Sequence, residues 1–129
     1  MSEHRSLGGI EAMVLRLGPG EDLFTELRSF VIDGDWQEAV IAGAAGSFDK
    51  AVVCYPKGAT LPPIVERTGL DGVFEISSLS GNARRLEDGS VHVHIHGSFA
   101  ENGVKVYGGA IGEGTRVFKM ADLFLLGTR

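Results

Sequence analysis

Residues 91–111 have the sequence VHVHIHGSFAENGVKVYGGAI, and this stretch decides the fold. From Val91 to His96 apolar side chains alternate with histidines, which is the period of a β-strand. Asn102-Gly103 readily supplies the positive φ angles of a tight hairpin, so a second strand is expected to return antiparallel over residues 104–111. The stretch therefore predicts an antiparallel hairpin that carries histidines on one face.

The position of Ala110 in this hairpin depends on the length of the turn. A three-residue loop with Gly103 as a bulge would place Ala110 across from His94, whereas a two-residue loop would place it across from Ile95. Ala110 is therefore a candidate neighbour of the histidine face.

His92, His94 and His96 share one face of the predicted strand. Imidazole is the commonest protein ligand of transition metals, so the row predicts a site for a divalent metal such as zinc. A strand rises about 3.3 Å per residue, which separates the outer two α-carbons by about 13 Å and keeps one ion from binding all three rings. Two neighbours such as His94 and His96 could share an ion if a third ligand came from an adjacent strand or another subunit. The alternative is a solvent-facing strand whose polar positions are histidines.

One helix is predicted between residues 21 and 34. Its apolar stripe consists of Leu23, Phe24, Leu27, Phe30 and Val31. Glu21 and Asp22 are expected in the first turn, where carboxylates complement the helix dipole and oppose a phosphate site, and Gly34 is placed to end the helix.

The other periodic segments predict strands separated by short turns, and hence a largely antiparallel sheet. They are residues 13–17, 39–42, 50–55, 73–79, 91–99, 104–111 and 116–126. Residues 56–72 contain Pro62-Pro63 and are interpreted as an excursion at the sheet edge. Residues 116–126 also fit helical spacing, but we favour a strand.

The length of 129 residues suits a single compact domain, with a core at about residues 13–126. Its net charge of −5 repels nucleic acid unless basic groups gather on one patch. No apolar segment approaches the roughly 20 residues of a membrane span, and no secretory leader is recognisable, so a cytoplasmic protein without membrane contact is expected. Cys54, the single cysteine, lies in an apolar run and is interpreted as a small buried side chain.

Several short motifs follow one another in an order that resembles the plant-and-prokaryote conserved (PPC) domain family. They are Gly20-Glu21-Asp22-Leu23, Gly46-Ser47-Phe48, Phe74-Glu75-Ile76-Ser77-Ser78-Leu79-Ser80-Gly81, His94-Ile95-His96, and Val106-Tyr107-Gly108-Gly109 followed by Glu113-Gly114. The resemblance covers about residues 13–126, and residues 75–81 are its most specific part. It implies an α+β fold with a mostly antiparallel sheet and one main helix, assembled as a homotrimer.

The chain departs from the family pattern in two respects. Prokaryotic relatives tend to have histidines at the equivalents of His94, His96 and Ala110, so the resemblance implies that one imidazole of the set is absent here. His92 could substitute for it on the same face. In plants the domain accompanies DNA-binding AT-hooks, and prokaryotic members are described as DNA-binding by that analogy, but this sequence holds no Arg-Gly-Arg-Pro hook. We therefore expect this chain alone to bind DNA poorly.

Two functional hypotheses follow. The first is a homotrimeric interaction protein that recruits protein partners in a regulatory, DNA-associated assembly. The second is a protein that binds a divalent metal or a small ligand at the histidine strand, with hydrolytic chemistry as one form. No complete catalytic set is recognisable, which favours a role other than catalysis.

Overall fold

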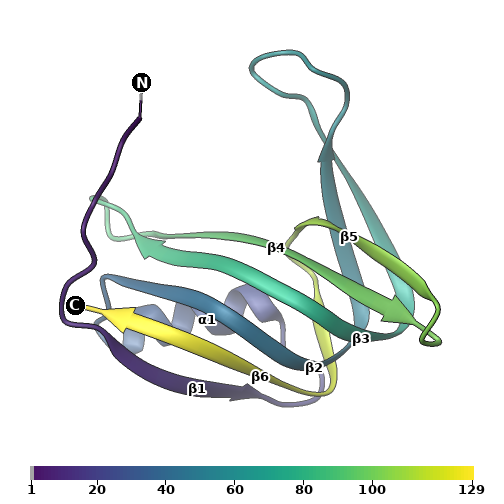
Figure 1. The fold of residues 1–129 in the computed structure, drawn as a ribbon, viewed down its shortest axis with the longest axis horizontal. Helices are drawn as coiled ribbons and strands as arrows, with labels where there is room; N and C mark the ends of the chain where they lie inside the picture. Colours follow the sequence, from purple (N-terminus) through teal and green to yellow (C-terminus); the bar gives the residue numbers. More distant parts are fainter. Residues whose placement is uncertain (1) are drawn as a thin grey trace.

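The computed structural model describes residues 2–129, and its strands form one antiparallel sheet in the order β1-β6-β2-β3-β4-β5 (Figure 1). The elements are β1 (Glu11–Leu17), α1 (Leu23–Asp33), β2 (Glu38–Pro56), β3 (Val65–Arg85), β4 (Val91–Glu101), β5 (Lys105–Ile111) and β6 (Arg116–Thr128). The α+β fold predicted from the sequence is confirmed. Residues 116–128 are strand throughout, so the helical alternative for this segment is wrong. No helix among residues 2–129 is long and apolar enough to cross a membrane.

The sheet closes on itself at one end, because β2 also pairs with β5. Strands β2, β3, β4 and β5 thereby form a small barrel whose interior is filled by aromatic rings. Phe74 and Phe99 meet edge to face with their centroids 5.3 Å apart, and Phe99 stacks on Tyr107 at 5.9 Å. Such ring pairs add to the stabilisation that burial alone provides. The barrel is the rigid element on which β4 presents its outward side chains.

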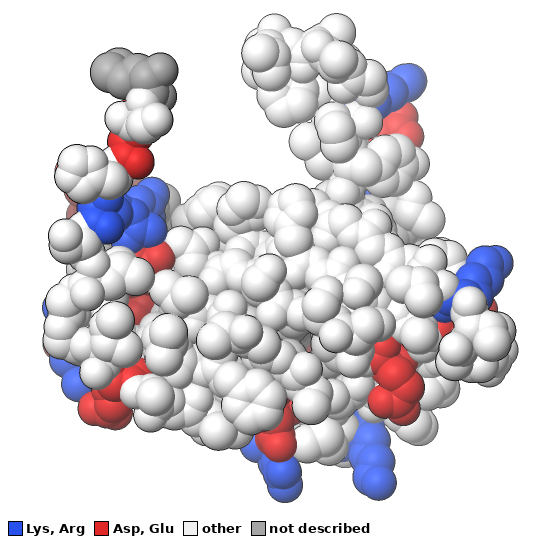
Figure 2. All heavy atoms as spheres, in the orientation of Figure 1, with Lys and Arg blue, Asp and Glu red and all other residues white. Residues whose placement is uncertain are grey.

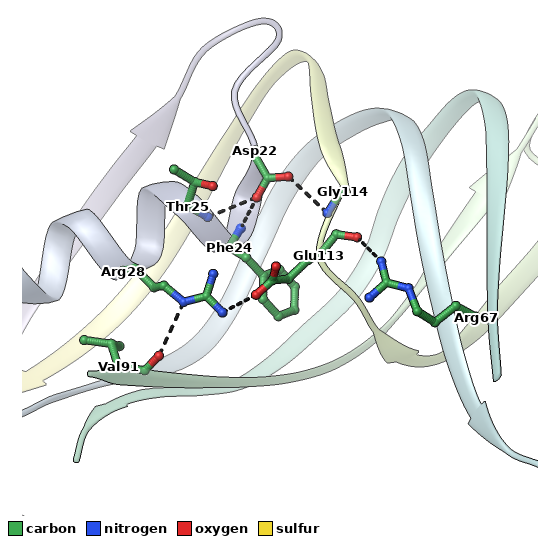
Figure 3. Close-up of polar contacts among 8 residues, drawn as sticks. All are labelled: Asp22, Phe24, Thr25, Arg28, Arg67, Val91, Glu113 and Gly114. Atoms are coloured by element: carbon green, nitrogen blue, oxygen red, sulfur yellow. Dashed lines mark hydrogen bonds and ion pairs between the residues drawn. The ribbon is translucent and has the colours of Figure 1, made fainter. Parts of the chain in front are cut away.

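Helix α1 begins directly after Asp22, which is the N-cap rather than part of the first turn (Figure 3). One carboxylate oxygen of Asp22 accepts from the backbone N–H groups of Phe24 and Thr25, both at 3.0 Å. The other accepts from the N–H of Gly114 at 3.1 Å. Asp22 therefore satisfies N–H groups of the helix N-terminus with its own side chain. The helix ends at Gly34 as predicted.

The loop between β5 and β6 is tied to α1 and to β3, and α1 is tied in turn to β4 (Figure 3). Arg28 of α1 forms an ion pair with the Glu113 side chain, and its Nε donates to the carbonyl of Val91 on β4 at 3.4 Å. Arg67 of β3 donates to the carbonyl of Glu113 at 2.6 Å. These contacts hold the helix against the closed end of the sheet.

Strands β2 and β3 are longer than the sequence patterns predicted. Two separate strands were expected on either side of residues 43–47, but they form one continuous strand, β2. Residues 65–70 were expected in an excursion at the sheet edge. They belong instead to β3 and pair with β2 from Pro56↔Val65 to Ala51↔Leu70. Small and polar residues conceal the strand period in these stretches. Beyond the sheet, residues 55–66 continue as a projecting hairpin that we call the arm (Figure 1).

Gly81 sets the approach of β3 to the histidine strand. Its φ is +142°, and a Cβ there would lie 1.9 Å from the carbonyl oxygen of His94. A side chain at this position would push β4 away, so the terminal glycine of the most specific motif has a packing role.

Helix α1 covers one face of the sheet and leaves the other face open (Figure 1). We define the open face by the outward side chains of Val14 on β1, Phe124 on β6, and His92, His94 and His96 on β4. Val14 and Phe124 are partners in the ladder and are 59% and 43% exposed. Figure 2 shows this side of the molecule: acidic and basic side chains gather at its margin, and the centre carries neither.

Candidate functional site

The three predicted histidines lie on β4 with exposed side chains, because Val91, Ile95 and Phe99 alternate with them and turn inward. The ring centroids of His94 and His96 are 5.1 Å apart, and those of His92 and His94 are 6.3 Å apart. The shared face predicted from the sequence is therefore observed. His94 and His96 form a pair, and His92 stands further along the strand.

Ala110 lies directly across from His96, so neither predicted register is correct. The turn leaves three residues between the last paired positions, Glu101 and Lys105. This pairing places Ala110 opposite His96, the residue two positions after His94 on β4. Ala110 nevertheless borders the histidine face, as expected. The position that resemblance assigns to a third histidine is thus adjacent to His96.

A pocket of about 380 Å³ lies where the arm leaves the barrel. His94, His96 and Ala110 form one side of it, and Cys54 lies on the neighbouring strand β2. The apolar rim comes from the base of the arm and consists of Tyr55, Pro56, Pro63 and Val65. His92 does not line this pocket. An apolar wall with two imidazoles and one thiol suits a small ligand or a soft metal ion more than a highly charged one.

Cys54 is the site residue that sequence reasoning missed. It pairs with Ala110, which pairs with His96, so three neighbouring strands bring the three side chains into one row. Its Sγ lies 2.6 Å from the point where a Cβ on Gly112 would stand, so the glycine leaves room for the sulfur. The sequence predicted a fully buried Cys54, but its side chain is only half-buried. Only the closure of the barrel creates this neighbourhood, and no local sequence pattern signals it.

No three of the His, Cys, Asp and Glu side chains within residues 2–129 are grouped closely enough to hold a metal ion as they stand. The His94–His96 pair supplies two imidazoles, and a complete shell requires either a rotation of the Cys54 side chain or a group from a second copy of the chain.

A second polar cluster adjoins the histidines on the same face. Glu38 of β2 is only 2% exposed. Its carboxylate accepts hydrogen bonds from both terminal nitrogens of Arg5, and from the side-chain amide nitrogen of Asn82 at 2.7 Å. Asn82 is the ladder partner of His94. The hydrogen-bonded Arg5 guanidinium lowers the pKa of the Glu38 carboxyl below its ordinary value, although burial opposes this effect. The cluster joins residues far apart in the sequence and was not predicted.

Comparison with protein-family models gives a match, and it covers nearly the whole chain. Residues 4–127 match the Plants and Prokaryotes Conserved (PCC) domain, also abbreviated PPC. The chain belongs to this family. A comparison with curated proteins finds no match.

Several solved structures are similar over 90% or more of this chain. A PPC protein from Pyrococcus horikoshii is 28% identical, with a TM-score of 0.81, and the alignment covers 100% of this chain and 85% of that one. A metal-containing protein from Archaeoglobus fulgidus is 29% identical, with the same TM-score of 0.81 and coverage of 99% and 86%. At 14% identity and a TM-score of 0.75, a protein from Ralstonia eutropha described as a candidate DNA-binding protein shows the shared fold alone, with coverage of 90% and 76%.

Proposed function

We propose that this PPC domain is a homotrimeric interaction module that acts in a regulatory assembly and meets DNA through its partners. The observation that supports this role is the open face, where apolar groups such as Val14 and Phe124 are exposed around an uncharged centre (Figure 2). Soluble monomers rarely leave a broad apolar patch uncovered, and contact between copies would cover it.

The charge of the domain supports contact with protein rather than direct contact with DNA. Each copy carries a net charge of −5, so a trimer would carry three times that charge. Binding to duplex DNA depends on the release of counterions by clustered basic groups. Arg16 and Arg116, at the margins of the sheet, are already paired with Asp122 and Asp49.

Sedimentation of the purified chain tests the assembly directly. We expect the mass of three copies at micromolar concentration. A single-copy mass across that range would overturn the proposal. As a second measurement, Val14→Asp should lower the mass, because it buries a carboxylate in the contact, whereas Ile32→Asp on the outer side of α1 should not.

A second candidate function is binding of a divalent transition metal at the pocket beside the arm. Two observations favour it: His94 and His96 line one pocket together with Cys54, and a relative at 29% identity is a metal-containing protein. In this proposal the two imidazoles bind zinc, with Cys54 or a group from a neighbouring copy as the third ligand and water completing the shell. A thiolate favours zinc over manganese, so the identity of the preferred metal reports on the cysteine.

Calorimetric titration with zinc separates these ligands. We expect His94→Ala to remove most of the binding and Cys54→Ser to weaken it if the thiol is a ligand. His92→Ala is the matched control, since it lies on the same strand outside the pocket and should bind zinc as the parent does. Equal binding by the parent and His94→Ala would exclude this site.

A further inference from the structure

The tip of the arm is apolar and contacts little of its own chain. Leu61 is 89% exposed and Ile64 is 61% exposed, although the hairpin below them is well formed. Tyr55 pairs with Glu66, and the N–H of Lys57 donates to the carbonyl of Ile64 at 2.7 Å. An ordered hairpin that ends in exposed leucine and isoleucine has no packing purpose within one copy.

A groove at the opposite side of the molecule has matching chemistry. It has a volume of about 310 Å³ and lies across β1, β6 and β2 on the open face. Its walls include Ala12, Val14, Ala42, Phe124 and Leu126. In Figure 1 the arm projects at one end of the sheet, and β1 and β6 lie away from it. The arm of one copy therefore cannot fill the groove of the same copy.

We propose that the arm tip of each copy, through Leu61 and Ile64, inserts into the groove beside Val14 and Phe124 of the next copy. The inference rests on the proposed homotrimer and assigns its contact. Because arm and groove are different surfaces, the contact is heterologous, and three such contacts related by a threefold axis close into a ring.

Charge supports a second copy as the occupant. Two copies of net charge −5 repel each other, and a contact between surfaces without carboxylates does not add to this repulsion. From Pro56 to Val65 the only charged residue is Lys57, and its charge is balanced within the arm by Glu66 at 3.6 Å, so the arm tip brings no net negative charge to a second copy. An arm tip alone is smaller than the roughly 800 Å² per partner of a stable interface. Ring closure compensates, because each copy gives one arm and receives another.

The arrangement also affects the pocket beside the arm. Pro63 and Val65 of the arm form part of its rim, so a neighbouring copy that holds the arm lies next to His94 and His96. The assembly would thus shield the pocket from solvent on that side.

Mutual rescue of two variants tests the proposal. The arm variant is Leu61→Asp with Ile64→Asp, the groove variant is Phe124→Asp, and Ile32→Asp on α1 is the exposed apolar control. Circular dichroism confirms that each variant is folded. By sedimentation we expect the parent and the control to have the mass of three copies and each interface variant that of one. Arm-variant copies keep their grooves and groove-variant copies keep their arms, so an equal mixture retains one arm-in-groove contact per pair. Because this pair lacks the closed ring, we expect it to be weak and to be captured as a two-copy species by chemical cross-linking at raised protein concentration, which neither variant alone should give.

The outcomes distinguish the two proposals. A single-copy mass for the parent overturns the homotrimer and with it the arm contact. A three-copy mass for both the parent and the arm variant overturns the arm contact alone and leaves the arm free for a different partner. Loss of assembly in both variants without a cross-linked two-copy species in their mixture also overturns the pairing of arm with groove, because an isologous contact permits no such rescue.

Discussion

The helix-covered face of the sheet and the open face are built from the same strands, yet they differ in what they expose. On the covered side, Leu123 and Leu125 of β6 are fully buried beneath α1. On the open side of the same strand, Phe124 remains 43% exposed. Alternation along a strand sorts side chains into two faces, but only the position of the helix decides which face becomes the core. The chain itself thus leaves one apolar face uncovered, and this is the face that the proposed contact between copies uses.

The largest expected difference between the two faces is in stability. Phe99→Ala removes a ring that contacts both Phe74 and Tyr107, and we expect it to lower the free energy of unfolding by about 3–5 kcal/mol. Val14→Ala should change it by about 0.5 kcal/mol within one copy. Urea unfolding at several protein concentrations checks both values. The loss in Phe99→Ala should persist at every concentration, whereas any larger loss in Val14→Ala should grow with concentration, as expected for an interface.

Glu38 is the exception on the open face, because it is a charged group that is buried there. Glu38→Gln should lower the free energy of unfolding by about 1–3 kcal/mol near neutral pH, since it weakens the hydrogen bonds from Arg5 and Asn82. The lowered pKa of Glu38 gives the sign of the pH dependence: its contribution is complete above the unfolded-state pKa and is lost as pH falls through the folded-state pKa. The difference between parent and variant should therefore shrink in acid. Glu75→Gln, at an exposed position of β3, is the control.

A change at Ala110 would sharpen the view of the histidine pair. Ala110→His places an imidazole directly across from His96 and should raise zinc affinity by about tenfold, or 1.4 kcal/mol, because a protein ligand replaces water. Calorimetry of the variant and of the double variant Ala110→His/His94→Ala measures the gain. An affinity of Ala110→His equal to that of the parent would show that the ring at this position does not reach the ion.

The smallest expected effect is on DNA binding. On the face that Figure 2 shows, acidic and basic side chains lie mixed at the margin, and Arg16 and Arg116 are paired with Asp122 and Asp49. With a net charge of −5 as well, the dissociation constant for duplex DNA should be weaker than micromolar at about 150 mM salt. Fluorescence anisotropy with labelled duplexes measures it. Submicromolar binding that weakens steeply with salt would contradict the charge argument.

Local sequence patterns were sufficient to predict the helix, most of the strand positions and the histidine face, but not the full length of β2 and β3 or the neighbours of that face. The helix end at Gly34, the strand character of residues 116–126 and the common side of His94 and His96 all follow from spacing and turn chemistry. The partner of Ala110 depends on the exact turn length, which Asn102-Gly103 alone does not determine. Cys54 and Glu38 join the site through barrel closure and through Arg5, 33 residues away from Glu38.

The position of β6 has a consequence for how the chain folds during synthesis. The last strand lies between β1 and β2 and pairs with both, from Glu11↔Gly127 on one side and Glu38↔Thr128 on the other. While the ribosome is still adding residues, β1 and the first half of β2 have no partner at this edge and expose unpaired N–H and C=O groups. The hairpins from β2 to β5 can form earlier, so the barrel can fold first. The nascent chain therefore carries an open strand edge until β6 has left the ribosome, and an unpaired edge of this kind favours aggregation.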